Sequence, residues 1–78
     1  MEILRNRALA ESVRQHLMED DRLGGQSLEV VASGGFIQVI GRVDTEEQKE
    51  LALKLAKGVM GVRDVEDRIV VRDDSEDE

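Results

Sequence analysis

The stretch at residues 35–43, with the sequence GFIQVIGRV, constrains the fold of this chain more than any other segment. Every second position carries an apolar side chain or a glycine, in the row Ile37, Val39, Gly41 and Val43. This two-residue period predicts a β-strand that buries one face. The opposite face carries Phe36, the only aromatic residue of the chain, so we expect this ring to lie outside the core.

Length and charge limit what the rest of the chain can do. With 78 residues and no cysteine there is room for one domain without disulfides, predicted at residues 1–72. Residues 73–78 hold five acids and no base, which predicts a disordered acidic tail. These acids account for five of the seven net negative charges, leaving −2 for residues 1–72. No nucleic acid partner is expected, because affinity for phosphate comes from Lys and Arg.

Periodic apolar residues predict the elements before this strand. A helix is predicted over residues 2–20 from one apolar stripe, made of Ile3, Leu9, Ala10, Val13 and Leu17. Leu23 is expected to anchor the following loop. Alternation predicts a strand with the inner residues Leu28, Val30 and Ala32. The turn Ser33-Gly34-Gly35 then joins the two strands as a hairpin.

The second half predicts one more helix and one more strand. The helix follows a cap at Asp44 or Thr45, whose capping-box partner is Glu47 or Gln48. Gly61 fits a left-handed cap after its last turn. Its buried stripe consists of Leu51, Ala52, Leu55, Ala56 and Val59. The last strand alternates, with an inner row at Val65, Asp67, Ile69 and Val71.

The resulting order is α-β-β-α-β. It predicts an α+β fold with two helices packed on one face of a three-stranded mixed sheet. A right-handed crossover through the second helix makes the third strand parallel to the second. Whether the third strand lies beside the second or the first is left open. Nothing in residues 1–72 is left to cover the other face of the sheet.

The spacing of glycines and apolar residues repeats a known family pattern. The first half reads Leu28-x-Val30-x-Ala32-x-x-Gly35-x-Ile37-x-Val39-x-Gly41-x-Val43. The second half reads Ala52-x-x-Leu55-Ala56-x-x-Val59-x-Gly61-Val62-x-x-Val65-x-x-x-Ile69-x-Val71, and the first helix adds Val13-x-x-x-Leu17. Together these spacings resemble the BON domain (bacterial osmotically induced and nodulation domain) over roughly residues 9–71.

The resemblance implies a fold and a class of function. It implies the α-β-β-α-β arrangement, no catalytic residues, no cofactor and a link to stress response. It also implies attachment to membranes, or their protection, through phospholipid contact. Members are usually periplasmic or envelope proteins, often with paired BON copies, whereas this chain has one copy.

The sequence also carries a prediction about location. The N-terminus has no apolar run of signal-peptide length, and no later stretch approaches the roughly 20 apolar residues of a membrane span. As written, the chain is predicted to be cytoplasmic. A trimmed form of an exported protein would be periplasmic.

Strand parity assigns the binding surface to the sheet face that the helices leave uncovered. Eight residues are predicted to form it: Val31, Phe36, Gln38, Ile40, Arg42, Arg68, Val70 and Arg72. Four apolar side chains beside three arginines suit a phospholipid or a protein, including a second copy of this chain. The alternative is scattered surface hydrophobics that bind nothing. A further hypothesis is cation sensing by the acidic segments.

Three other features have ordinary structural interpretations. The run Gly58-Val59-Met60-Gly61 matches the G-x-x-G loop of KH domains, but its apolar middle pair favours a helix end. His16, the only histidine, is predicted to be a half-buried structural residue, because no Cys or second His could complete a metal site. The scattered serines offer no nucleophile with a nearby base, so no enzyme activity is predicted.

Overall fold

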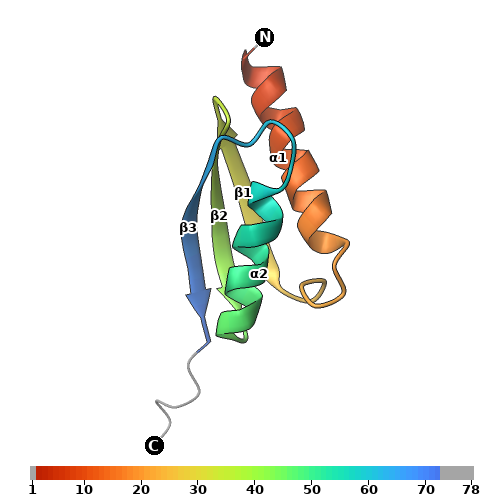
Figure 1. Cartoon of the computed structure of the whole chain (residues 1–78), viewed down its shortest axis with the longest axis vertical. Coiled ribbons are helices and arrows are strands. Elements are labelled where there is room, and N and C mark those ends of the chain that lie inside the picture. The colour runs from red at the N-terminus through yellow and green to blue at the C-terminus, as the bar shows by residue number, and fades with distance from the viewer. Residues whose placement is uncertain (1, 73–78) are drawn as a thin grey trace, which may run out of the picture.

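The computed structural model describes residues 2–72 and follows the predicted order of elements. These elements are α1 (Glu2–Met18), β1 (Ser27–Ser33), β2 (Phe36–Val43), α2 (Glu46–Lys57) and β3 (Asp64–Val71). Both helices lie on the same side of the sheet (Figure 1). The predicted α+β fold is therefore confirmed. The tail predicted at residues 73–78 lies outside the described residues.

The sheet has the order β1-β2-β3, with β2 in the centre. β1 pairs with β2 antiparallel through the predicted hairpin, and β2 pairs with β3 in parallel. The parallel pair is possible because α2 carries the chain back to the starting end of β2. The position of β3, left open by the sequence, is thus beside β2 (Figure 1).

The core lies between this sheet and the two helices. Its buried residues are Val13, Leu17, Leu23, Leu28, Ile37, Val39, Val43, Ala52, Ala56 and Ile69. They include the inner row of β2 and members of both predicted helix stripes, so the two-residue and four-residue periods are confirmed. Leu23, in the loop after α1, is completely buried as a loop anchor. All large buried side chains are aliphatic, as the composition requires.

The first helix begins at Glu2 as predicted but differs from its prediction at its C-terminal end and in the exposure of its first turn. It stops at Met18 rather than at residue 20. Ile3, which was placed beside the apolar stripe, is 74% exposed. Figure 1 shows the reason, because the first turn of α1 rises above the β1–β2 turn and has no sheet beneath it. The helical period identifies a stripe but does not say how far the partner surface extends.

The ends of α2 confirm one predicted cap and correct the other. Thr45 is the N-cap, and Gln48 completes the capping box. The C-cap is Gly58 in a right-handed conformation, not Gly61. Gly61 has φ +99° and lies three residues further on, in the turn that leads to β3. The left-handed glycine of this segment therefore serves the loop, because the helix has already ended at Lys57.

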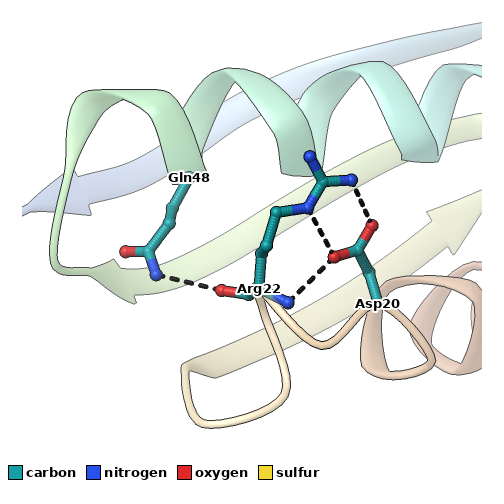
Figure 2. A network of polar contacts seen from close by, with 3 residues as sticks. All are labelled: Asp20, Arg22 and Gln48. Atoms are coloured by element: carbon teal, nitrogen blue, oxygen red, sulfur yellow. Dashed lines mark hydrogen bonds and ion pairs between the residues drawn. The ribbon is translucent and has the colours of Figure 1, made fainter.

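A polar network fastens the α1–β1 loop to the start of α2 (Figure 2). The Asp20 carboxylate accepts hydrogen bonds from the backbone N–H and the guanidinium of Arg22, at 2.8–2.9 Å. The side-chain hydrogen bond from Arg22 is the main reason that the pKa of Asp20 falls to about 2. The Nε2 of Gln48 donates to the Arg22 carbonyl at 3.0 Å. Gln48 therefore caps α2 and holds the loop at the same time.

We expect Gln48→Ala to lower the free energy of unfolding by about 1–2 kcal/mol. The change removes the capping box, in which the Gln48 Oε1 accepts from the N–H of Asp44 and of Thr45, and it also frees the loop. Urea denaturation followed by circular dichroism measures the effect. Gln15→Ala, at an exposed site on α1, is the control, and an equal effect of the two changes would contradict this role.

Candidate functional site

Both helices of residues 2–72 pack on one face of the sheet and leave the opposite face without a helix over it. We call it the open face, formed by the outward side chains of the three strands. All eight predicted site residues lie on it or at its end. Val31, Phe36 and Val70 are 48%, 54% and 58% exposed. Gln38 and Ile40 are half-buried, and the arginines at 42, 68 and 72 are exposed.

The strand register arranges the open face in four rows. From the hairpin end they are Ser33-Phe36-Asp64, Val31-Gln38-Glu66, Glu29-Ile40-Arg68 and Ser27-Arg42-Val70. Each row contains one apolar residue, so the apolar side chains are spread along the face rather than gathered in one block. Acidic groups stand mainly at the hairpin end and arginines at the other end. This separation of charge was not predicted from the sequence.

Two of the three predicted arginines already have acidic partners. The Nε of Arg68 donates to Oε2 of Glu66 at 3.0 Å. Arg72, just past β3, lies 3.9 Å from an Asp44 carboxylate oxygen. Arg42 differs from both, because it forms no ion pair with any residue in 2–72. Of the three predicted arginines, Arg42 is therefore the one available to bind an acidic group of a partner.

Arg63, in the loop before β3, contacts the open face at Phe36 and was not predicted from the sequence. Its guanidinium carbon lies 5.5 Å from the centre of the Phe36 ring, within the range of a cation–π contact. Its backbone N–H donates to the Gly35 carbonyl at 2.7 Å, which fixes the loop beside the hairpin. Strand parity could not find Arg63 because it precedes β3. No pattern in the sequence pairs this loop with Phe36.

A shallow hollow of about 270 Å³ lies at the hairpin end of the open face. Its apolar walls include Val31 and Phe36, and its carboxylates are Asp64 and Glu66. Glu66 also accepts a hydrogen bond from Nε2 of Gln38 at 3.1 Å. Asp64 accepts only from the neighbouring Val65 N–H, so among residues 2–72 it has no cationic partner. The hollow suits an apolar stem that ends in a positive charge.

A second concave region, of about 540 Å³, lies between α1, the hairpin turn and the α2–β3 loop. Arg5 and Arg63 contribute positive charge, and Leu9 and Met60 contribute apolar surface. Met60 is 93% exposed. The Gly34 N–H donates to Oδ1 of Asn6 at 2.9 Å, which ties the hairpin turn to the helix. We call this region the α1 groove. Its walls come from three distant segments, so no pattern in the sequence predicts this groove.

The other features considered from the sequence, namely His16, the acidic clusters and the G-x-x-G run, do not form a site in the described residues. His16 is exposed, which corrects the prediction of a half-buried residue, because its part of α1 faces solvent beside Glu19. In the described part of the chain, no three His, Cys, Asp or Glu side chains gather closely enough to hold a metal ion. The G-x-x-G run forms a turn into β3, with Val59 packed against the core. None of the helices in residues 2–72 is long and apolar enough for a membrane span.

Comparison with known proteins decides the family. A sequence profile described as the BON domain matches residues 6–73 of this chain. The chain belongs to the BON domain family. This BON domain is 33% identical over 69 residues to osmotically-inducible protein Y of Escherichia coli (strain K12). The match covers 88% of this chain and 34% of that protein. The chain thus spans about a third of the length of this curated relative, a protein named for its induction by osmotic stress.

Proposed function

We propose that this BON domain is a non-catalytic contact module that binds a protein partner through its open face. The observation that carries the proposal is the uncovered sheet face, with the side chain of Phe36, the only Phe, Tyr or Trp of the chain, 54% exposed at its hairpin end. Large apolar side chains cost free energy when water surrounds them, and their contact with a partner recovers it. The family supports the absence of catalysis, because BON domain proteins are generally non-catalytic.

The charges on the open face favour protein over an anionic membrane. Glu29, Asp64 and Glu66 stand among the arginines, and Glu66 already neutralises Arg68. Anionic bilayers attract clusters of Lys and Arg, whereas this chain has a net charge of −7. Interfaces between proteins commonly mix apolar and polar groups in the way this face does. We therefore propose protein rather than an anionic membrane as the partner of the open face.

Photo-crosslinking from the open face tests this function. We expect a photoreactive residue at position 38 to crosslink to protein in cells that produce the chain, and Phe36→Asp to abolish those products. The same probe at Arg7, on the exposed side of α1, is the matched control. Equal crosslinking from both positions, or products that persist with Phe36→Asp, would show that the open face is not the contact surface.

Phospholipid is the second candidate partner, and the α1 groove is the observation that favours it. Its two arginines suit a lipid phosphate, and Leu9 with Met60 suits the adjoining apolar chain. Leu4, 62% exposed on the first turn of α1, adds apolar surface to the same end of the molecule. Membrane contact is also what the resemblance to the BON family implies.

Co-sedimentation with vesicles of phosphatidylglycerol and phosphatidylethanolamine separates the two surfaces. If lipid binds in the α1 groove, Met60→Asp abolishes pelleting and Phe36→Asp preserves it. The reverse result assigns lipid to the open face. Failure of the unaltered chain to pellet removes phospholipid as a partner.

A further inference from the structure

We infer that the partner of the open face is a second copy of this chain, stacked face to face with its strands antiparallel to those of the first. The inference rests on the proposed function and names its partner. It follows from the charge separation along the open face, because the carboxylates at the hairpin end can pair with the arginines at the other end. A twofold axis that crosses the strands brings opposite ends together.

The strand register shows which residues such an axis opposes. When the twofold axis lies between the two middle rows, the first row of one copy faces the fourth row of the other. Phe36 then faces Arg42 of the second copy, and Glu66 faces Arg68. Gln38 and Ile40 face each other across the axis. Among the residues of the four rows, no two like charges face each other. Twisted sheets pack at roughly 30° to each other, so these pairings are approximate.

The hollow and Arg42 complement each other in this arrangement. Arg42 is exposed and has no ion pair within residues 2–72. Its guanidinium therefore offers a positive charge at the end of an apolar side-chain stem. The hollow at the other end offers the Phe36 ring and the carboxylates of Asp64 and Glu66. Because Arg63 lies over the same ring, the carboxylates supply most of the attraction. The twofold axis makes this contact twice in each dimer.

The other simple twofold arrangement is disfavoured by charge. An axis that runs along the strands would place each β2 residue opposite its own copy. Phe36 would meet Phe36, but Arg42 would meet Arg42 on the central strand, at the end of the face away from the hairpin. Like charges placed directly opposite each other cost several kcal/mol. The axis across the strands is therefore the one consistent with the observed register.

The size of the open face sets the expected strength of the dimer. Strand and residue spacings give a contact on the order of 500 Å² from each copy. The total of about 1,000 Å² is at the lower limit for a specific interface. We therefore expect a reversible dimer that forms at high micromolar concentration and separates on dilution.

Sedimentation equilibrium of charge-swapped variants tests this inference. We expect the unaltered chain to dimerise, and Arg42→Glu or Asp64→Arg to weaken the dimer at least about tenfold, because each creates two repulsive contacts. Mixing these two variants restores both contacts, so the mixture dimerises again. Arg7→Glu and Glu11→Arg, at exposed sites on α1, make the same charge changes and leave the dimer intact.

Two outcomes would overturn the inference. One is an unaltered chain that stays monomeric at about 1 mM, well above the range expected for an interface of this size. The other is a dimer that both swaps leave unchanged, which would use another surface. Circular dichroism melts exclude misfolding of the variants. If crosslinking from position 38 to other proteins persists in either case, the open face still binds and only the identity of its partner is wrong.

Discussion

Gly41→Ala should strongly destabilise this BON domain. Gly41 has φ +151° in the middle of β2, a conformation that side chains rarely adopt. A Cβ at this position would lie 1.9 Å from the Ser27 carbonyl oxygen and 3.0 Å from the Leu28 Cα. Both are backbone atoms of β1, so the strand must move away and lose its pairing. We expect a loss of at least about 3 kcal/mol.

Urea denaturation of Gly41→Ala and Gly25→Ala measures this effect against a matched control. Gly25 lies in the α1–β1 loop, has no positive φ, and a Cβ there meets nothing within 4 Å. Its replacement should change stability by less than about 1 kcal/mol. Equal stability of the two variants would contradict the close approach of β1 and β2 at Gly41.

Leu17→Ala is the second substitution with a large expected effect. Leu17 is completely buried on α1, where that helix packs against the core. Removing its side chain loses buried apolar surface and leaves a cavity, at a cost of about 3 kcal/mol. A domain of this size has only about 4–10 kcal/mol of stability. Thermal melts should therefore show a melting temperature lowered by more than about 10 °C.

Leu4→Ala makes the same chemical change on the same helix at a residue that is 62% exposed. It should cost less than about 0.5 kcal/mol, because little buried surface is lost. If Leu4→Ala and Leu17→Ala melted at the same temperature, α1 would not pack as described.

The sequence was sufficient for the fold because each inner row is continuous in one strand or helix. Ile37, Val39 and Val43 predicted the buried side of β2, and all three are buried. The same parity put Phe36 outside the core, where the structure has it. Thr45 with Gln48 marked the start of α2 through a local hydrogen-bond pattern. Such features depend on neighbours within a few residues, which a single sequence shows directly.

The candidate site was only partly predictable, because its contacts join distant segments. Arg63 reaches Phe36 from a loop, and Glu66 bonds Gln38 on another strand. From the sequence, Arg68 was predicted to bind a ligand, whereas in the structure it forms an ion pair with Glu66. The α1 groove was likewise not predictable, because its walls come from segments far apart in the sequence. Parity identifies which side chains share a face but not which of them neutralise each other.

Proton NMR of the Phe36 ring with a soluble gadolinium chelate tests the central claim most directly. The ring signals are those of the chain's only aromatic residue other than His16, so they are readily assigned. In dilute protein we predict strong paramagnetic broadening, because the open face is bare, and protection as the concentration rises and the face is covered. Ring signals that stay sharp in dilute protein would show that the chain itself covers this face.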